Sequence, residues 1–262
     1  MSCLRPSNYR AYIKNQTVFD AVAITFDMDW APDWCIQLCY DLCKAADCGA
    51  TFFATHESSV IQTVRRDERF EVGLHPNFGP DSTHGGSRQE ILEYCSRVVP
   101  EAVSMRTHRL EQSAMLFGEL SRNWPNIIND SSILCPFQPN LSPFMLYAGH
   151  ADAGLLRIPY FWEDDVAACE PSWDWEMFPL RAGLKVFNFH PVLVALNMKT
   201  MDQYLKLKET HVLPQCTEND LKNFTNKDGR GTRTFLEECL LSLGRNSITI
   251  KEIGNRVRSG GG

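Results

Sequence analysis

Residues 21–30 read AVAITFDMDW, and this stretch decides the fold that the sequence predicts. A short apolar run that ends abruptly in two carboxylates is typical of a buried strand of a parallel sheet. At the carboxyl end of such a strand, side chains project into the crevice where α/β proteins bind ligands. Asp27 and Asp29 share a parity, so we expect both to point into one pocket. Crowded carboxylates favour a nearby cation; the alternative is a strand-end aspartate plus a helix N-cap.

The composition is that of an ordinary globular protein. The chain has 262 residues, of which 44% are hydrophobic and 22% charged, and this length suits a single α/β domain. A formal net charge of −6 argues against a nucleic-acid partner. The sequence contains no apolar window long enough to span a membrane and no secretory signal near its start, so a cytoplasmic location is expected. The oligomeric state stays open.

The ten cysteines are scattered, and no CxxC pair occurs among them. Structural zinc of the finger or ribbon type is therefore not expected. Cys35, Cys39 and Cys43 recur at a spacing of four residues, which predicts one side of a helix. We interpret them as small buried hydrophobic residues, with a thiolate metal site as the alternative.

Similar buried runs recur along the chain, and helical patterns separate most of them. They occupy residues 50–55, 70–75, 103–106, 126–128, 155–160 and 184–190. Together with the first run, they predict about seven strands in a parallel α/β barrel, with its site at the strand carboxyl ends. We expect one domain over residues 1–262, with a barrel core at about 21–197 and a C-terminal helical extension at about 198–256.

Several of the predicted strands deliver polar side chains. These side chains are Asp27, Asp29, His75, His84 in the loop after the third strand, Arg106, the acidic run at 163–165, and His190. Two histidines and one carboxylate form the ligand set of a catalytic zinc or a similar cation. A second carboxylate can take a proton from water, a histidine can protonate a leaving group, and an arginine can orient the carboxylate. These parts suffice for metal-assisted hydrolysis of an amide or ester.

The motifs, in this order and rough spacing, resemble the NodB-like polysaccharide deacetylases. They are residues 25–29 (TFDMD), 50–53 (ATFF), 71–75 (EVGLH), Arg106 and 189–191 (FHP). The loop at 74–78, with His84-Gly85 beyond it, looks most like the WbmS-like branch. The resemblance implies a distorted parallel (β/α)7 barrel that removes acetyl groups from N-acetylated or O-acetylated sugars. The implied partner is an acetylated sugar or polysaccharide precursor in surface-polysaccharide synthesis.

The resemblance also implies a role for each matching residue. Asp27 would be the general base, oriented by Arg106, and His190 the general acid. Asp165 is placed as the acidic residue that assists the general acid. Asp29, His75 and His84 would hold a divalent metal ion, with zinc expected first and cobalt, nickel or iron as alternatives.

One position departs from the family pattern. The usual second metal histidine lies four residues after the first, where this chain has Gly79. Either the loop folds back to present His84, or Asn77 or water fills the place. An incomplete site would leave a catalytically silent barrel that binds a glycan or nucleotide-sugar, and a metal amidohydrolase of non-sugar amides is a third reading.

The remaining histidines and the tryptophans stay without an assigned role. The histidines are His56, His108, His150 and His211, and His108, two residues after Arg106, is the one expected nearest the pocket. Trp162, Trp173 and Trp175 form either a sugar-stacking platform or ordinary packing, and packing is the more common role of tryptophan.

Overall fold

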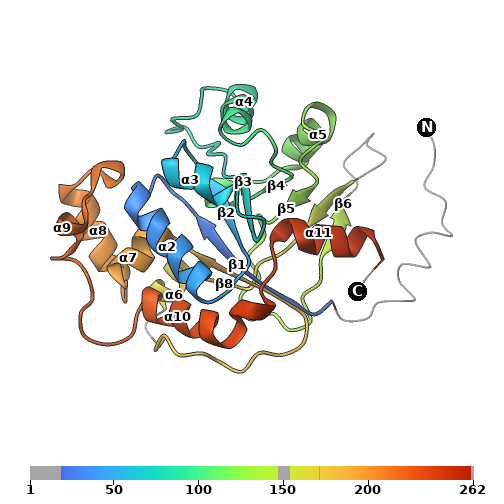
Figure 1. The fold of residues 1–262 in the computed structure, drawn as a ribbon. Helices are drawn as coiled ribbons and strands as arrows, with labels where there is room; N and C mark the ends of the chain where they lie inside the picture. Colours follow the sequence, from blue (N-terminus) through green and yellow to red (C-terminus); the bar gives the residue numbers. More distant parts are fainter. Residues whose placement is uncertain (1–18, 147–153, 171, 261–262) are drawn as a thin grey trace, which may run out of the picture.

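A computed structural model describes residues 19–146, 154–170 and 172–260 (Figure 1). The strands are β1 (Ala21–Asp27), β2 (Ala50–Ala54), β3 (Phe70–Leu74), β4 (Ser104–Met105), β5 (Asn129–Asp130), β6 (Phe144–Leu146), β7 (Leu155–Arg157), β8 (Trp162–Glu163) and β9 (Leu184–Phe189). The helices are α2 (Asp33–Ala45), α3 (Ser59–Val64), α4 (Arg88–Val98), α5 (Ala114–Asn123), α6 (Asp164–Cys169), α7 (Pro191–Leu196), α8 (Met201–Thr210), α9 (Glu218–Leu221), α10 (Thr232–Leu243) and α11 (Ile250–Arg258). None of these helices is long and apolar enough to cross a membrane.

The described strands form one curled sheet in the order β6-β7-β5-β4-β3-β2-β1-β9-β8. All the paired strands are parallel except β6, which runs antiparallel to β7. Figure 1 shows helices on the outside of this sheet, with α2, α3, α4 and α5 following one another along it. The predicted distorted α/β barrel is confirmed, with two short additions, β6 and β8.

The fifth strand begins later than the sequence predicts. Residues 126–128 were expected to form it, whereas β5 is Asn129–Asp130. The backbone N–H of Ile127 still donates to the carbonyl of Trp124, because a turn follows α5. The N–H groups of Ile128 and Asn129 then both reach the carbonyl of Val103, so regular pairing starts only after that point.

Strand alternation divides the side chains of β1 between two layers. Ile24 and Phe26 belong to the large apolar cluster under the helices, whereas Ala21 and Ala23 belong to a second cluster inside the barrel. Asp27 has the parity of the interior residues, so it continues this inner row at the carboxyl end of the strand. The inner row thus changes from apolar to polar along its length.

Helix α11 covers the amino end of the barrel. Its first N–H groups would lack partners within the helix. The N–H of Ile250 donates to Thr51 Oγ1 at 2.9 Å, and that of Lys251 to Glu71 Oε2 at 2.7 Å. Ile250 and Ile253 also pack into the interior cluster. Polar side chains of β2 and β3 therefore cap the helix that closes this end.

The predicted cysteine face is confirmed on α2. Cys35, Cys39 and Cys43 are buried, free, and part of the large apolar cluster. Burial raises the pKa of each of these thiols. Over the described part of the chain, no group of metal-type ligands includes a cysteine.

Gly73 in β3 lets two neighbours approach closely. A Cβ atom there would lie 2.8 Å from Phe53 Cδ1 and 2.8 Å from the carbonyl oxygen of Ser104. One of these obstacles is backbone, which cannot move aside cheaply.

We therefore expect Gly73→Ala to lower the free energy of unfolding by about 1–3 kcal/mol, because it overpacks a buried site. Urea denaturation measures the change. Gly86→Ala is the matched control, since its Cβ would meet nothing closer than Glu90 Oε2 at 3.6 Å. Equal stability of the two variants would contradict this account of β3.

Candidate active site

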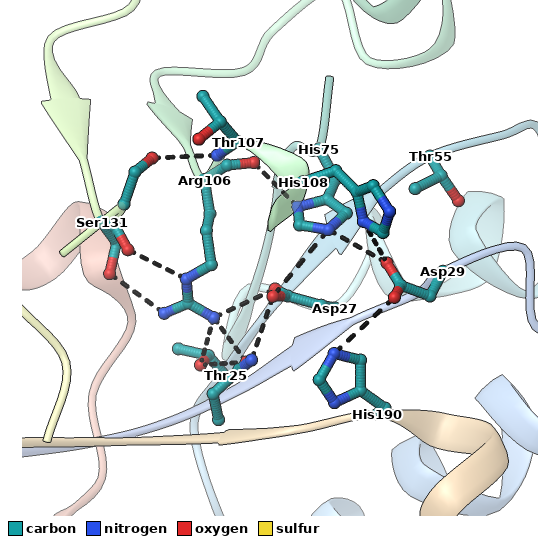
Figure 2. Close-up of polar contacts among 12 residues, drawn as sticks. Thr25, Asp27, Asp29, Thr55, His75, Arg106, Thr107, His108, Ser131 and His190 are labelled. Carbon is teal, nitrogen blue, oxygen red and sulfur yellow. Dashed lines mark hydrogen bonds and ion pairs between the residues drawn. The ribbon is translucent and has the colours of Figure 1, made fainter. Parts of the chain in front are cut away.

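The carboxyl ends of β1, β3, β4 and β9 bring a compact set of polar side chains together (Figure 2). The set comprises Asp27, Asp29, His75, Arg106, His108 and His190. Five of these residues were singled out in the sequence, and His108 was the unassigned histidine expected nearest the pocket. Of the other two predicted site residues, Asp165 lies beside His190 at the edge of this set, and His84 belongs to none of the ligand groups in the described residues.

Arg106 is fully buried and hydrogen-bonded on every nitrogen of its guanidinium. Its Nη1 donates to Asp27 Oδ1 and to Thr25 Oγ1, each at 3.0 Å, and also to Asn188 Oδ1. Its Nε donates to the carbonyl of Ser131 and its Nη2 to the hydroxyl of Ser131, again at 3.0 Å. These bonds fix one oxygen of Asp27.

Two aromatic rings enclose the same guanidinium. The centroids of Phe53 and Tyr160 lie 4.6 Å and 4.4 Å from Arg106 Cζ. A cation over a ring face gains electrostatic attraction, most strongly where water is excluded. The rings and the hydrogen bonds together compensate for burying the charge.

Asp29 reaches the site from a turn and not from the strand. Strand β1 ends at Asp27, and Asp29 and Trp30 have φ values of 44° and 57°, in the left-handed region. The shared strand parity that the sequence indicated therefore does not place Asp29. The turn is held by the N–H of Trp30, which donates to Thr55 Oγ1 at 3.1 Å. Such backbone strain is often found at functional sites.

Two imidazoles converge on one oxygen of Asp29. His75 Nε2 and His108 Nδ1 each lie 3.1 Å from Asp29 Oδ1. Burial alone would raise the pKa of Asp29, but the hydrogen bonds from His108 and His75 hold it well below its usual value. Burial would lower the pKa of His75, yet Asp27 and Asp29 raise it. The site therefore favours an additional positive charge.

The protonation pattern of His75 shows which kind of charge fits. Its Nδ1 lies 2.8 Å from the carbonyl oxygen of Arg106, which can only accept, so Nδ1 carries the proton. In the neutral ring, Nε2 then points a lone pair at a carboxylate oxygen of Asp29. A metal ion between them would satisfy both, and a histidine that donates its other N–H to a carbonyl is the usual arrangement around metals. Asp29, His75 and His108 together therefore fit a divalent cation.

Two other groups of ligand-type side chains occur in the described residues, namely Asp27 with Glu163 and His190, and Asp164 with Asp165 and His190. In the first group, N–H donors of Arg106 and Asn188 already bind both oxygens of Asp27. In the second, Asp164 binds the histidine itself. Both groups suit a cation less well than the group around Asp29.

The loop after β3 does not bring His84 to Asp29 and His75. The Nδ1 atom of His84 accepts the backbone N–H of Asn77 at 3.2 Å, which ties the ring to its own loop. The ring stacks on Tyr94 at 4.8 Å and lies 5.4 Å from Trp30. Burial lowers the pKa of His84 to about 4, so it is neutral. The second histidine beside Asp29 is instead His108.

His190 is held by Asp164 and not by Asp165. Its Nδ1 lies 2.7 Å from Asp164 Oδ1, and its backbone N–H donates to Asp164 Oδ2 at 2.9 Å. Burial would lower the pKa of His190, but Asp164 raises it well above the usual value. Asp165 instead accepts the N–H of its neighbour Val166. Within the acidic run at 163–165, the side chain that contacts the histidine is therefore Asp164, one residue before the predicted Asp165.

A small cavity of about 50 Å³ adjoins Asp29 and His190. Its other lining residues are Met28, Asp165, Val192, Leu193, Met201 and Tyr204. A larger cavity, about 550 Å³, lies at the amino end near Glu71 and Lys251, away from these side chains. The site thus has a mainly apolar recess beside its polar groups.

Of the three tryptophans, Trp162 and Trp175 are packing residues, whereas Trp173 also lines, together with Trp162, a cavity of about 360 Å³. Trp162 and Trp175 are buried, and their rings lie against Phe235 of α10. Trp173, which is half-buried, contacts the same phenylalanine. Of the unassigned histidines, His56 and His211 belong to none of the ligand groups found in the described residues, and His150 lies outside those residues.

Comparisons with known proteins point to one family. A sequence profile of the WbmS-like polysaccharide deacetylases matches residues 24–208. A crystal structure from Bordetella bronchiseptica, described as a polysaccharide deacetylase involved in O-antigen biosynthesis, is 34% identical and superposes with a TM-score of 0.70. The similarity covers 84% of this chain and 90% of that one. No curated protein sequence matches.

The buried guanidinium leads to a prediction about stability. Arg106→Lys should lower the free energy of unfolding by about 3–5 kcal/mol, because an ammonium group cannot serve Ser131 and Asp27 at once. Chemical denaturation measures it. Arg109→Lys is the control, since that residue makes an exposed ion pair with Asp81 and should change stability by less than about 1 kcal/mol. A tolerated Arg106→Lys would show that the pairing of this charge matters little.

Proposed function

The chain belongs to the WbmS-like polysaccharide deacetylase family, and we propose that it is a metal-dependent enzyme that removes an acetyl group from an N-acetylated or O-acetylated sugar. The observation that carries this proposal is the convergence of His75 and His108 on Asp29, next to Asp27 and His190. We propose a surface-polysaccharide precursor as the substrate, in line with the O-antigen role described for the Bordetella protein.

We propose that Asp29, His75 and His108 hold the metal ion. One carboxylate and two histidines suit zinc first, with cobalt, nickel or iron as alternatives, and leave positions open for water and substrate. When bound, such an ion lowers the pKa of water and polarises a carbonyl group. His108 thereby replaces the second histidine that the family usually carries in the loop after the third strand.

Asp27 and His190 lie where a general base and a general acid are needed. Arg106 orients Asp27, so its carboxylate can accept a proton from the attacking water. Asp164 holds His190 by Nδ1, so Nε2, which lies 3.7 Å from Asp29 Oδ2, is free to protonate the leaving atom of the sugar. Asp27 thus accepts a proton from water, and His190 donates a proton to the leaving atom.

The small cavity supports a short acyl group. Met28, Val192 and Leu193 give it apolar walls, and Asp29 and His190 lie at its polar side. A methyl group placed there would be removed from water while its carbonyl stays beside the reactive side chains. An acetyl group is short enough to be compatible with a recess of this size.

The proposed activity predicts acetate release from acetylated sugars, including nucleotide-sugars and oligosaccharides, by the zinc-loaded enzyme. Asp27→Asn and His190→Ala should each lower kcat by about 10²–10⁴-fold, since they remove proton transfer. Asp165→Asn, which leaves the Asp164–His190 contact intact, should change kcat far less. Sugar binding without any acetate release would identify a silent barrel, and release from non-sugar amides alone would point to another amidohydrolase.

The ligand assignment predicts a pattern of zinc affinities. Titration calorimetry on chelator-stripped protein should give one site, weakened at least about 100-fold by Asp29→Ala, His75→Ala or His108→Ala. His84→Gln should bind zinc within about threefold of wild type. Thermal melts check that every variant is folded. If His84→Gln loses the metal and His108→Ala keeps it, the original loop assignment is right and His108 is not a ligand.

A further inference from the structure

The amide of Asn188 lies between two carboxylates. Its Nδ2 donates to Asp27 Oδ2 and to Glu163 Oε1, each at 3.0 Å. Its Oδ1 accepts from Arg106 Nη1 and lies 2.9 Å from Thr25 Oγ1. Both amide hydrogens and the carbonyl oxygen are thus used. A flipped amide would point its oxygen at two carboxylates, so this orientation is fixed.

Glu163 supplies the acceptor for the second amide hydrogen. Its other oxygen accepts the hydroxyl of Tyr160 at 2.9 Å. The ring of Tyr160 also covers Arg106, so the same tyrosine contacts both ends of the network. Burial, followed by the charge of Asp165, raises the pKa of Glu163 to about 7. The family reaction proposed above assigns no role to this carboxyl group.

We propose that Glu163 is a positioning residue for the general base and acts through Asn188. Arg106 fixes Asp27 Oδ1, and Asn188 fixes Asp27 Oδ2. Without an acceptor at Glu163, one N–H of the amide would lose its partner, and the amide could rotate away from Asp27. The carboxylate of Asp27 would then be held on one side only. This inference rests on the proposed deacetylase function.

Positioning of this kind affects the rate more than binding. A base displaced by a fraction of an ångström to 1 Å lowers the rate by up to about 10²-fold. Neither Glu163 nor Asn188 contacts Asp29, His75 or His108 through a described hydrogen bond, so zinc affinity should not depend on them. Loss of kcat with unchanged KM and zinc affinity is therefore the signature that separates positioning from general damage to the site.

The test compares Glu163→Leu with Glu163→Gln in the zinc-loaded enzyme. Glu163→Leu should lower kcat by about 10- to 100-fold, with KM and the zinc Kd within about threefold of wild type. Glu163→Gln keeps an oxygen acceptor for the amide and should recover kcat to within about fivefold. Glu170→Leu, an exposed acid just beyond α6, is the matched control and should leave all three quantities unchanged.

A double-mutant cycle decides whether Glu163 acts through the amide. If it does, Glu163→Leu should cost little in kcat when added to Asn188→Ala, because the intermediary is already gone. Effects that multiply would overturn the proposal, as would a Glu163→Leu enzyme with normal kcat. If the wild-type enzyme releases no acetate, the proposed function fails. Crystal structures of the wild type and of Glu163→Leu then test the positioning role separately. A rotated Asn188 amide in the variant supports that role, and an unmoved amide overturns it.

Discussion

The buried charge of Arg106 is the constraint on which the site depends. A guanidinium without access to water must have its donors satisfied inside the protein, or folding becomes strongly unfavourable. The acceptors are Thr25 and Asp27 of β1, Asn188 of β9, and Ser131 just after β5, which are far apart in the chain. The need to compensate one cation therefore determines where the carboxylate of Asp27 lies and which way it faces.

Along the barrel axis, the interior side chains of β1 change from apolar residues that pack to polar residues that form the candidate site. Toward the amino end the inner row is apolar, and α11 packs against it through Ile250 and Ile253. The guanidinium of Arg106 follows, and the cluster of Asp29, His75 and His108 lies beyond the strand ends. Each strand that contributes to this order does so by alternation alone, since residues of one parity face inward. Rigid, well-packed layers beneath the site keep the polar side chains in place.

The sequence predicted the fold, and it singled out the polar side chains at the ends of regular strands that the structure brings together. Asp27, His75 and His190 lie at the ends of regular buried strands, so their direction could be read from periodicity. Asp29 and His108 depend on left-handed turns and loop paths, which no period encodes. The path of the loop at 76–86, which contains His84, could not be predicted because its eleven residues are mostly turn-forming. In the structure, the backbone N–H of Asn77 donates to the His84 ring and holds it within this loop. The choice between Asp164 and Asp165 depended on where α6 begins, a boundary that propensity locates only to within a residue or two.

The closure of the amino end by α11 has a consequence for the order of folding. Strand β1 donates the N–H of Ile24 to Ser247 Oγ, across 223 residues of sequence, and it also pairs with the distant β9. During synthesis, β1, β2 and β3 emerge long before either partner exists. Such long-range contacts slow folding, and one edge of β1 stays unpaired meanwhile. A nascent chain of this protein thus passes through a stage at which a strand edge is open to wrong partners.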